Sequence, residues 1–329
     1  MKQIQLANYG QPEEVAHCVN VPDLPAPADD EIVFQILAFP INPADIWFCR
    51  GAYRLKPALP AVPGAECVGK ITAIGKSVRH LHVGQHVINL QRENWAQQRC
   101  VKASEVVAIA ADLDPLQAAM LRINPPTASL LLSDIVKLQA GDWVVQNVAN
   151  SAVGRWLIRL AKRRGLRTVN IVRRAALFNE LNALGADVCV VDSPQLAEQV
   201  RVQTGHAPIR LALDAVAGAA SARLAECLAD DGVVCSYGSM TGEDPQIDRA
   251  ALIYRGVSLT GFMLGRFLAK RQAHEVQAIY AELADELRSG HLTIPIAATY
   301  PIDDIGPALR HAQQGERNGK VLVLPNGQL

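Results

Sequence analysis

The segment VVQNVANSAVG, Val144 to Gly154, contains residues whose types and spacing could bind a phosphate. An apolar run enters a turn of small residues, and an amphipathic helical pattern, RWLIRLAKRRG, leaves it. The three glycines of a dinucleotide-binding turn would fall at Ala149, Ser151 and Gly154, so only the third is kept. The start of the predicted helix still offers N–H groups to a phosphate, and Asn150 and Ser151 add side-chain donors. Taken alone, the turn fits a cofactor site and an ordinary strand-to-helix connection equally well. The alternation of strands and helices around it favours the cofactor.

A pair of basic residues ends the next predicted strand, TVNIVRR. An NAD-dependent enzyme usually has Asp or Glu at this place, where the carboxylate bonds the ribose 2′-hydroxyl, whereas arginine suits a 2′-phosphate. Arg173 and Arg174 stand there, and the first acid after them is Glu180. Guanidinium groups match phosphate oxygens in a bidentate manner. The pair therefore favours NADPH, and a solvated basic strand end is the alternative.

Two other groups of reactive residue types have weaker support. Tyr53 ends the turn-rich segment INPADIWFCRGAY, and on the residues alone a packing tyrosine with its hydroxyl at the surface is the better interpretation. His80, His82 and His86 lie in HLHVGQH, where a glycine turn interrupts the run and no acid or cysteine lies close by. We expect a surface turn there and no metal site, because ligand geometry must be specific.

Composition and charge argue against several functional classes. The 329 residues carry 32 basic and 32 acidic side chains, so the global charge does not direct the chain to nucleic acid or to an anionic membrane. The seven cysteines are scattered and contain no C-x-x-C pair, which favours a reducing compartment over a disulfide framework. No apolar run reaches membrane-spanning length, and the start, MKQIQLANYG, lacks the apolar core of a signal peptide. We therefore expect a cytoplasmic protein.

Three parts of the chain must position these residues. Residues 1–120 contain short strands with Gly and Pro turns, such as EIVFQILAF and GKITAIG, and predict a compact β-rich domain. Residues 121–264 alternate apolar strands with helical patterns, which predicts a doubly wound parallel sheet. Residues 265–329 contain a long helical stretch and two short strands, and they would have to return to the first domain to bury their apolar side. We therefore predict an α/β protein of two domains, the first built from both chain ends.

Seven motifs then add up to a family resemblance. They occur in order over nearly the whole chain: NPADIWFCRGAY, LPAVPGAECVG, INPPTAS, QNVANSAVG, LRTVNIVR, SYGSM and NGKVLVLP. With these motifs the chain resembles the medium-chain dehydrogenase/reductase superfamily. Within it, the chain is most similar to the zinc-independent 2-enoyl thioester reductases, which reduce trans-2-enoyl-CoA or enoyl-ACP with NADPH. The resemblance implies a Rossmann NADP-binding domain, a GroES-like catalytic domain and a homodimer formed by pairing of sheet edges.

The resemblance also implies roles for particular residues. Tyr53 matches a tyrosine regarded as catalytic, which would donate a hydrogen bond to the thioester oxygen while hydride adds to C3. Asn42 and Ala65 stand where the zinc-dependent branch has Cys and His, so no metal is expected. The implied cofactor contacts are Asn124, Asn150, Ser151, Ala152, Val153, Arg173, Arg174, Tyr237, Gly238, Ser239, Met240, Phe262, Met263, Leu264 and Lys320.

Two departures from the family pattern bear on specificity. Ala175 follows the arginine pair where Arg-Asp-Arg is common, and Met263 stands where Trp often lies beside the substrate. Two other functions share these features. One is an NADPH-dependent quinone or enone oxidoreductase, and the other is a non-catalytic binding protein of the same fold. Turnover of enoyl thioesters against quinones would separate all three.

Overall fold

The computed structural model describes residues 1–329, which form two compact units. Residues Met1–Ile123 and Gln277–Leu329 make up the first unit, and Asn124–Val276 make up the second. The second unit therefore begins near the expected boundary at residue 121 but ends beyond the expected boundary at residue 264. Residues 265–276 group with it because α10 (Leu264–Leu268) packs on α4 (Asn124–Asp134) and Arg271 forms an ion pair with Asp134 at 2.6 Å. The domain boundaries themselves stay a prediction.

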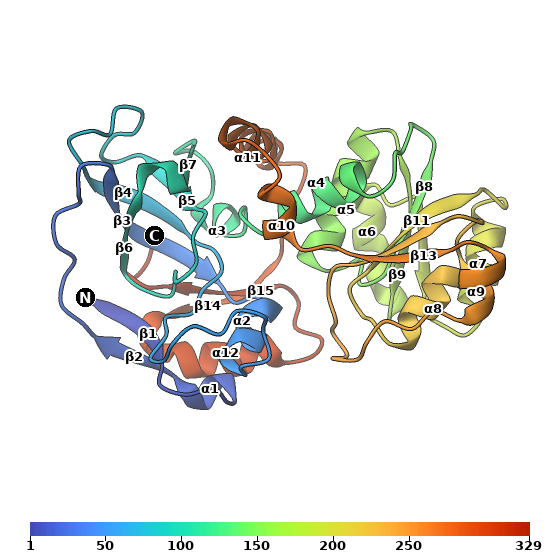
Figure 1. The fold of residues 1–329 in the computed structure, drawn as a ribbon, viewed down its shortest axis with the longest axis horizontal. Helices are drawn as coiled ribbons and strands as arrows, with labels where there is room; N and C mark the ends of the chain where they lie inside the picture. Colours follow the sequence, from blue (N-terminus) through green and yellow to red (C-terminus); the bar gives the residue numbers. More distant parts are fainter. The chain divides into compact units, whose positions relative to one another are not determined.

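The second unit contains a six-stranded parallel sheet in the order β10-β9-β8-β11-β12-β13 (Figure 1). Its strands are β8 (Trp143–Gln146), β9 (Arg167–Val172), β10 (Val188–Val191), β11 (Ile209–Asp214), β12 (Val233–Ser236) and β13 (Ser258–Gly261). Its other helices are α5 (Ala152–Arg163), α6 (Phe178–Leu184), α7 (Leu196–Gln203), α8 (Ala219–Glu226) and α9 (Arg249–Tyr254). The order reverses between β8 and β11, which is the switch point where α/β sheets bind ligands beyond the carboxyl ends of the strands.

Apolar side chains on both faces of this sheet explain its two helical layers. On one face Val172 of β9 packs with Ile158 of α5 and Leu181 of α6. On the other, strand residues pack with α7, α8 and α9, as in the contact of Val145 with the cluster around Leu224. Figure 1 shows the sheet between these two layers. The alternating strand and helix pattern of the sequence correctly predicted this mixed α/β architecture.

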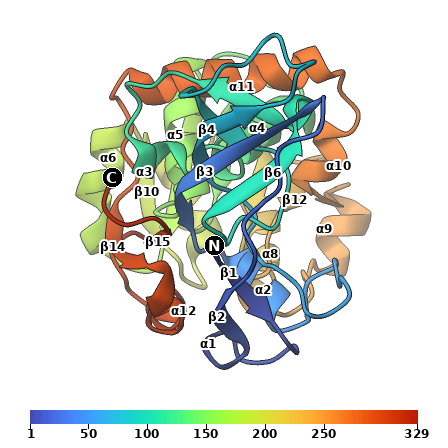
Figure 2. The same ribbon diagram turned by 90° about the vertical axis from the view of Figure 1, so that its left-hand side faces the viewer.

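The first unit contains a seven-stranded sheet built around the long strand β3 (Glu31–Pro40), in the order β14-β15-β3-β4-β5-β7, with β6 also paired to β3 (Figure 2). The other strands of this sheet are β4 (Val68–Ile74), β5 (His86–Asn89), β6 (Gln98–Lys102), β7 (Val106–Ile109), β14 (Ile296–Pro301) and β15 (Lys320–Leu324). A separate antiparallel pair consists of β1 (Lys2–Leu6) and β2 (Ala16–Asn20). The helices are α1 (Pro12–Val15), α2 (Pro43–Cys49), α3 (Pro115–Ala118), α12 (Ile305–Gln313) and α11 (Ala273–Arg288), which begins in the last residues of the second unit. The 3-10 turns are Ala103–Glu105 and Ile302–Asp304 here, and Ala175–Leu177 in the second unit.

The last strand of the chain, β15, lies inside this sheet, between β14 and β3. β15 pairs in parallel with β14 and antiparallel with the end of β3, where Val323 faces Phe39. One apolar core contains residues from both ends of the chain, including Ile4, Phe34 and Val323. The first unit therefore holds both chain termini (Figure 1). No helix combines the length and apolar character needed to cross a membrane.

Candidate active site

The turn after β8 is held by the side chain of Ser151. Ser151 is the N-cap of α5, and its Oγ accepts a hydrogen bond from the N–H of Gly154 at 3.1 Å. This bond satisfies one of the free N–H groups of the first helical turn and leaves others for a ligand. The serine at the second glycine position is therefore a capping residue as well as a small one.

The remaining positions of the turn explain why one glycine is kept and another is lost. A Cβ at Gly154 would lie 2.5 Å from the carbonyl oxygen of Ala149, so any side chain would push α5 away from the turn. Ala149 is itself buried, and its N–H donates to the carbonyl of Ile171 at 3.2 Å, so a methyl group fits at the first position. The backbone bends one residue earlier, at Val148, which adopts a φ of 50°. The sequence pattern did not predict this strained valine.

A buried carboxylate ties the end of β8 to the end of β11. Asp214 accepts hydrogen bonds from Asn147 Nδ2 at 2.6 Å and from Ser221 Oγ at 2.6 Å, while Asn147 Oδ1 accepts from the N–H of Ala215 at 2.8 Å. The backbone N–H of Val216 also donates to Asp214 at 2.9 Å. This network fixes the two strand ends at the switch point of the sheet. The motifs did not predict it, although polar residues directly after two apolar strands are a sequence signal that could have.

Two buried polar atoms of the second unit lack partners within the chain. They are Asn124 Nδ2, in the first turn of α4, and the hydroxyl of Tyr237, which follows β12. Burial, and secondarily the charge of Asp214, raises the pKa of the Tyr237 phenol far above its usual range, so this group is a neutral donor. Unpartnered buried donors are costly unless a ligand completes them. Both residues were expected at the cofactor, and their unpaired donors fit a ligand that is rich in hydrogen-bond acceptors.

Arg173 and Arg174 lie at the exposed carboxyl end of β9. The nearest acid in the following sequence, Glu180, forms an ion pair with Arg155 of α5 at 2.7 Å. Both arginines are exposed, and their expected role at a 2′-phosphate stays a prediction.

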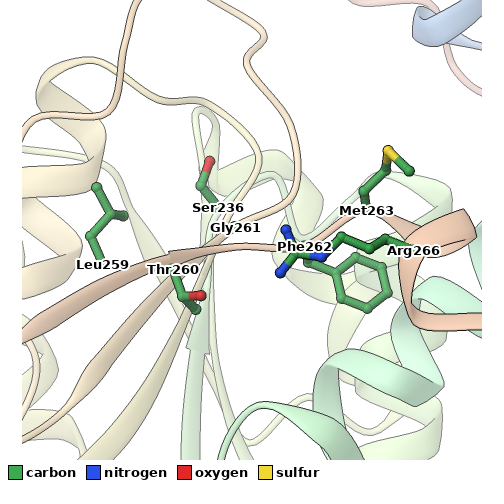
Figure 3. A pocket seen from close by; sticks show the side chains of 7 residues that line it. All are labelled: Ser236, Leu259, Thr260, Gly261, Phe262, Met263 and Arg266. Atoms are coloured by element: carbon green, nitrogen blue, oxygen red, sulfur yellow. The ribbon is translucent and has the colours of Figure 1, made fainter. Parts of the chain in front are cut away.

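A pocket of about 420 Å³ opens at the carboxyl ends of β12 and β13 (Figure 3). It is lined by Ser236, Leu259, Thr260, Gly261, Phe262, Met263 and Arg266. Phe262 is buried against Phe267, with ring centroids 4.4 Å apart, whereas Met263 is exposed. Met263, like Met240, is thus an exposed apolar member of the expected residues, and its flexible side chain can adapt to a ligand in this pocket.

The first unit holds a buried polar network around Asn42, one of the two positions where the zinc-dependent branch is expected to have a ligand. Asn42 donates through Nδ2 to Glu66 Oε1 at 2.7 Å and accepts from Lys320 Nζ through Oδ1. Glu66 Oε2 also accepts from the N–H of Ile123 at 2.9 Å. Ala65, at the second zinc-ligand position, offers only its backbone, and no group of three His, Cys, Asp or Glu side chains in the structure could hold a metal ion.

Burial shifts the titration of this network. It raises the pKa of Glu66 to about 7, against the opposing effect of the Lys320 charge, and it lowers the pKa of Lys320 to about 8. Lys320 is buried and its ammonium is bonded to Asn42, so its expected contact with the cofactor stays a prediction. Glu66 was not among the residues expected from the sequence, because a single acid in PGAE belongs to no spacing pattern that would indicate a functional role.

Tyr53 lies at the end of the turn that follows α2. Its N–H donates to the carbonyl of Trp47 at 3.1 Å, and its half-buried ring packs against the core of the first unit. The guanidinium carbon of Arg92 lies 5.2 Å from the centre of the ring. The hydroxyl makes no hydrogen bond within the chain, so it is available as a donor.

The expected site residues fall into two groups. Tyr53 and Lys320 belong to the first unit. The others belong to the second, at Asn124, at the turn before α5 and the start of that helix, and at the carboxyl ends of β9, β12 and β13. Each group is gathered by its own unit, and the roles of the residues stay predictions.

Comparison with known proteins bears out the resemblance. Two sequence families match, described as alcohol dehydrogenase GroES-like domain over residues 28–111 and zinc-binding dehydrogenase over residues 152–285. A Caenorhabditis elegans protein named mitochondrial enoyl-[acyl-carrier-protein] reductase is 35% identical over 298 residues, which are 88% of this chain and 86% of the relative. A Xenopus tropicalis protein of the same name is 32% identical over 315 residues, 93% of this chain and 90% of the relative. A solved structure from Bacillus thuringiensis, described as an NADPH:quinone reductase, covers 98% of both chains with a TM-score of 0.91 and 27% identity. The chain belongs to the medium-chain dehydrogenase/reductase family.

Proposed function

We propose that this protein reduces the C2=C3 double bond of a trans-2-enoyl thioester, carried on CoA or acyl carrier protein, with NADPH and without zinc. Curated relatives that match the chain over most of its length carry the name enoyl reductase. Within the structure, the proposal rests on one observation above all, the unpartnered hydroxyl of Tyr53. A phenol hydroxyl at that place can donate a hydrogen bond to a reacting carbonyl.

NADPH is the cofactor that the second unit fits. The N-terminus of α5 and its cap Ser151 offer donors to the pyrophosphate, and Asn124 and Tyr237 supply the unpartnered polar atoms. Arg173 and Arg174 would hold the 2′-phosphate. When bound, the cofactor supplies the hydride for C3, and the protein supplies orientation and electrostatics.

The chemistry assigned to the chain's own residues is stabilisation of charge. Addition of hydride at C3 moves the electron pair of the double bond toward the thioester carbonyl, whose oxygen becomes negative. Tyr53 donates a hydrogen bond to that oxygen, and a preorganised donor of this kind lowers the barrier by about 3 kcal/mol. C2 then takes a proton, from Tyr53 or from water, which completes the saturated thioester.

The metal-free site is part of the proposal. Asn42 occupies a ligand position of the zinc-dependent branch and is committed to Glu66 and Lys320. Both the nitrogen and the oxygen of the Asn42 amide are engaged in these hydrogen bonds, so the amide is not free to act as a metal ligand. Elemental analysis that finds about one tightly held zinc per chain would contradict this part of the proposal.

A substrate panel tests the reaction. The specificity constant should be higher for crotonyl-CoA and longer 2-enoyl-CoA thioesters than for quinones, with NADPH as the reductant. The structural relative described as a quinone reductase makes the quinone the second candidate substrate. Preference for a quinone over every thioester would move the protein to that class.

We also propose that the protein is a homodimer. β13 is one of the two outer strands of the parallel sheet, all of its residues are exposed, and α9, which precedes it in the chain, exposes Ile253 and Tyr254 at 65% and 76%. An open sheet edge beside apolar residues is suited to pairing with a second copy. Analytical ultracentrifugation should show a dimer that Ile253→Asp weakens, and a monomeric wild-type protein would contradict the proposal.

We also propose that the protein works in the cytoplasm. All seven cysteines are free thiols, which is typical of a reducing compartment.

A further inference from the structure

The side chain of Arg92 lies against three different parts of α2 and its following turn. Its guanidinium carbon is 5.5 Å from the centre of the Phe48 ring and 5.2 Å from that of the Tyr53 ring. Its Nη2 is 3.7 Å from Oδ1 of Asp45, a fully buried carboxylate in the first turn of α2. One planar cation therefore links the start of the helix, its last turn and the tyrosine that follows.

The loop that carries Arg92 is held firmly. The preceding residue, Gln91, donates its N–H to Asn89 Oδ1 at 3.0 Å, and its carbonyl accepts from Asn94 Nδ2 at 2.7 Å. Asn94 is buried and also donates to the carbonyl of Gly64 at 3.3 Å. The guanidinium is thus presented from a fixed backbone, which lowers the entropy cost of holding it in one place.

Tyr53, by contrast, is only partly buried, and its ring packs against the core of the first unit from one of the least enclosed parts of the chain. The residues that follow it, 54–60, are all exposed, and its hydroxyl has no partner in the chain. Its backbone is fixed by the bond to Trp47, but that bond leaves rotation of the side chain free. Contact of a planar guanidinium with an aromatic face is favourable and favours one orientation of the ring. A lysine ammonium group, which is not planar and sits on a flexible stem, would restrict the ring less.

We propose that Arg92 is a positioning residue for the reaction: by stacking on Tyr53 from a fixed loop, it holds the phenol ring in the orientation that presents its hydroxyl to the thioester oxygen. This role rests on the proposed enoyl thioester reduction. The carboxylate of Asp45 fixes the other side of the guanidinium, so the cation is held between the helix and the ring. Arg92 itself makes no contact with the reacting atoms in this scheme.

A double-mutant cycle tests the proposal. Arg92→Met should lower kcat for crotonyl-CoA by about ten-fold, because small displacements of a catalytic group are costly, while the KM for the thioester changes by less than about three-fold. Arg92→Lys keeps the charge but not the planar stack, so its kcat should lie between those of the wild type and Arg92→Met. In a Tyr53→Phe background, Arg92→Met should cost less than about two-fold, because the hydroxyl that it positions is already gone.

Arg50→Met is the matched control. Arg50, the C-cap residue of α2, also lies over an aromatic ring, that of Trp47 in α2, with the guanidinium carbon 5.6 Å from its centre, and it lies outside the proposed machinery. Its kcat should stay within about two-fold of the wild type, as expected for independent surface contacts. Melting temperatures of both variants separate loss of fold from loss of orientation.

The outcomes are distinct. A wild-type enzyme that reduces no enoyl thioester overturns the proposed function and the role of Arg92 with it. If the wild type is active and Arg92→Met stays within two-fold, only the role of Arg92 is overturned. An equal loss of kcat in the wild-type and Tyr53→Phe backgrounds overturns it as well, because Arg92 would then act independently of Tyr53. A loss of kcat that appears only with a much lower melting temperature shows general support of the fold and also overturns the proposal.

Discussion

Gly154→Ala tests the account of the turn most directly. The new Cβ would lie 2.5 Å from the carbonyl oxygen of Ala149 and 2.7 Å from its carbonyl carbon, whereas ordinary contacts begin at 3.4 Å. The first turn of α5 must therefore move by about 1 Å relative to backbone atoms that cannot rotate away. Such overpacking costs about 1–3 kcal/mol, and the better helix propensity of alanine returns up to about 1 kcal/mol. We expect a net loss of about 1–2 kcal/mol in the free energy of unfolding.

The same displacement should also weaken the binding of NADPH. Moving the N–H groups of α5 by about 1 Å removes the equivalent of one charge-assisted hydrogen bond to phosphate, about 1.5 kcal/mol, so the Kd for NADPH should rise about ten-fold. Thermal unfolding with and without NADPH, together with a fluorescence titration, measures both effects. Gly306→Ala in α12 is the control, because its Cβ would meet its nearest atom at 3.6 Å and should stabilise the protein slightly. A Gly154→Ala protein with unchanged stability and unchanged NADPH affinity would refute the reasoning.

Three further expectations concern single sites. Tyr53→Phe should lower kcat for enoyl thioesters by about 10- to 1000-fold with little change in NADPH affinity or melting temperature, and turnover within two-fold of the wild type would make Tyr53 a packing residue. Replacing Arg173 and Arg174 with alanine should raise the KM for NADPH far more than that for NADH in steady-state assays, and equal use of both cofactors by the wild type would contradict the assignment. Glu66 has its pKa raised by burial from about 4.5 to about 7, so between these values the folded state binds the proton more tightly and its contribution to stability is lost as the pH rises. Chemical unfolding should therefore show a fall in stability across this window that Glu66→Gln lacks, and identical pH profiles would argue that Glu66 titrates normally.

The turn before α5 illustrates how far sequence patterns reach. The position of the strand, the helix and the surviving glycine followed from periodicity and from the spacing of small residues. The bend at Val148 did not follow, because a β-branched residue at positive φ contradicts its own local preference and is imposed by the tertiary structure. The capping role of Ser151 was not predicted either, because a serine at this position is explained equally well by its small size and by its ability to cap the helix.

The candidate residues of the first unit were less predictable. Asn42, Glu66 and Lys320 are far apart in the sequence and meet only because β15 returns to the sheet that contains β3. Arg92 lies in a loop with no periodic pattern, and its partners are identified by distance alone. Local rules describe strands, helices and caps, whereas a buried charge network depends on topology that no single segment contains.

The return of β15 has a consequence for synthesis of the chain. The second unit, residues 124–276, can fold as soon as its own segment has left the ribosome, because every strand of its sheet lies within that segment. The first unit must wait for the last few residues. Until Lys320–Leu324 emerge, the end of β3 presents an open edge, and Asn42 has no ammonium group to accept from. The nascent chain therefore exposes an unpaired strand edge for most of its translation. Premature termination near the carboxyl end would leave a complete second unit attached to an incomplete first unit.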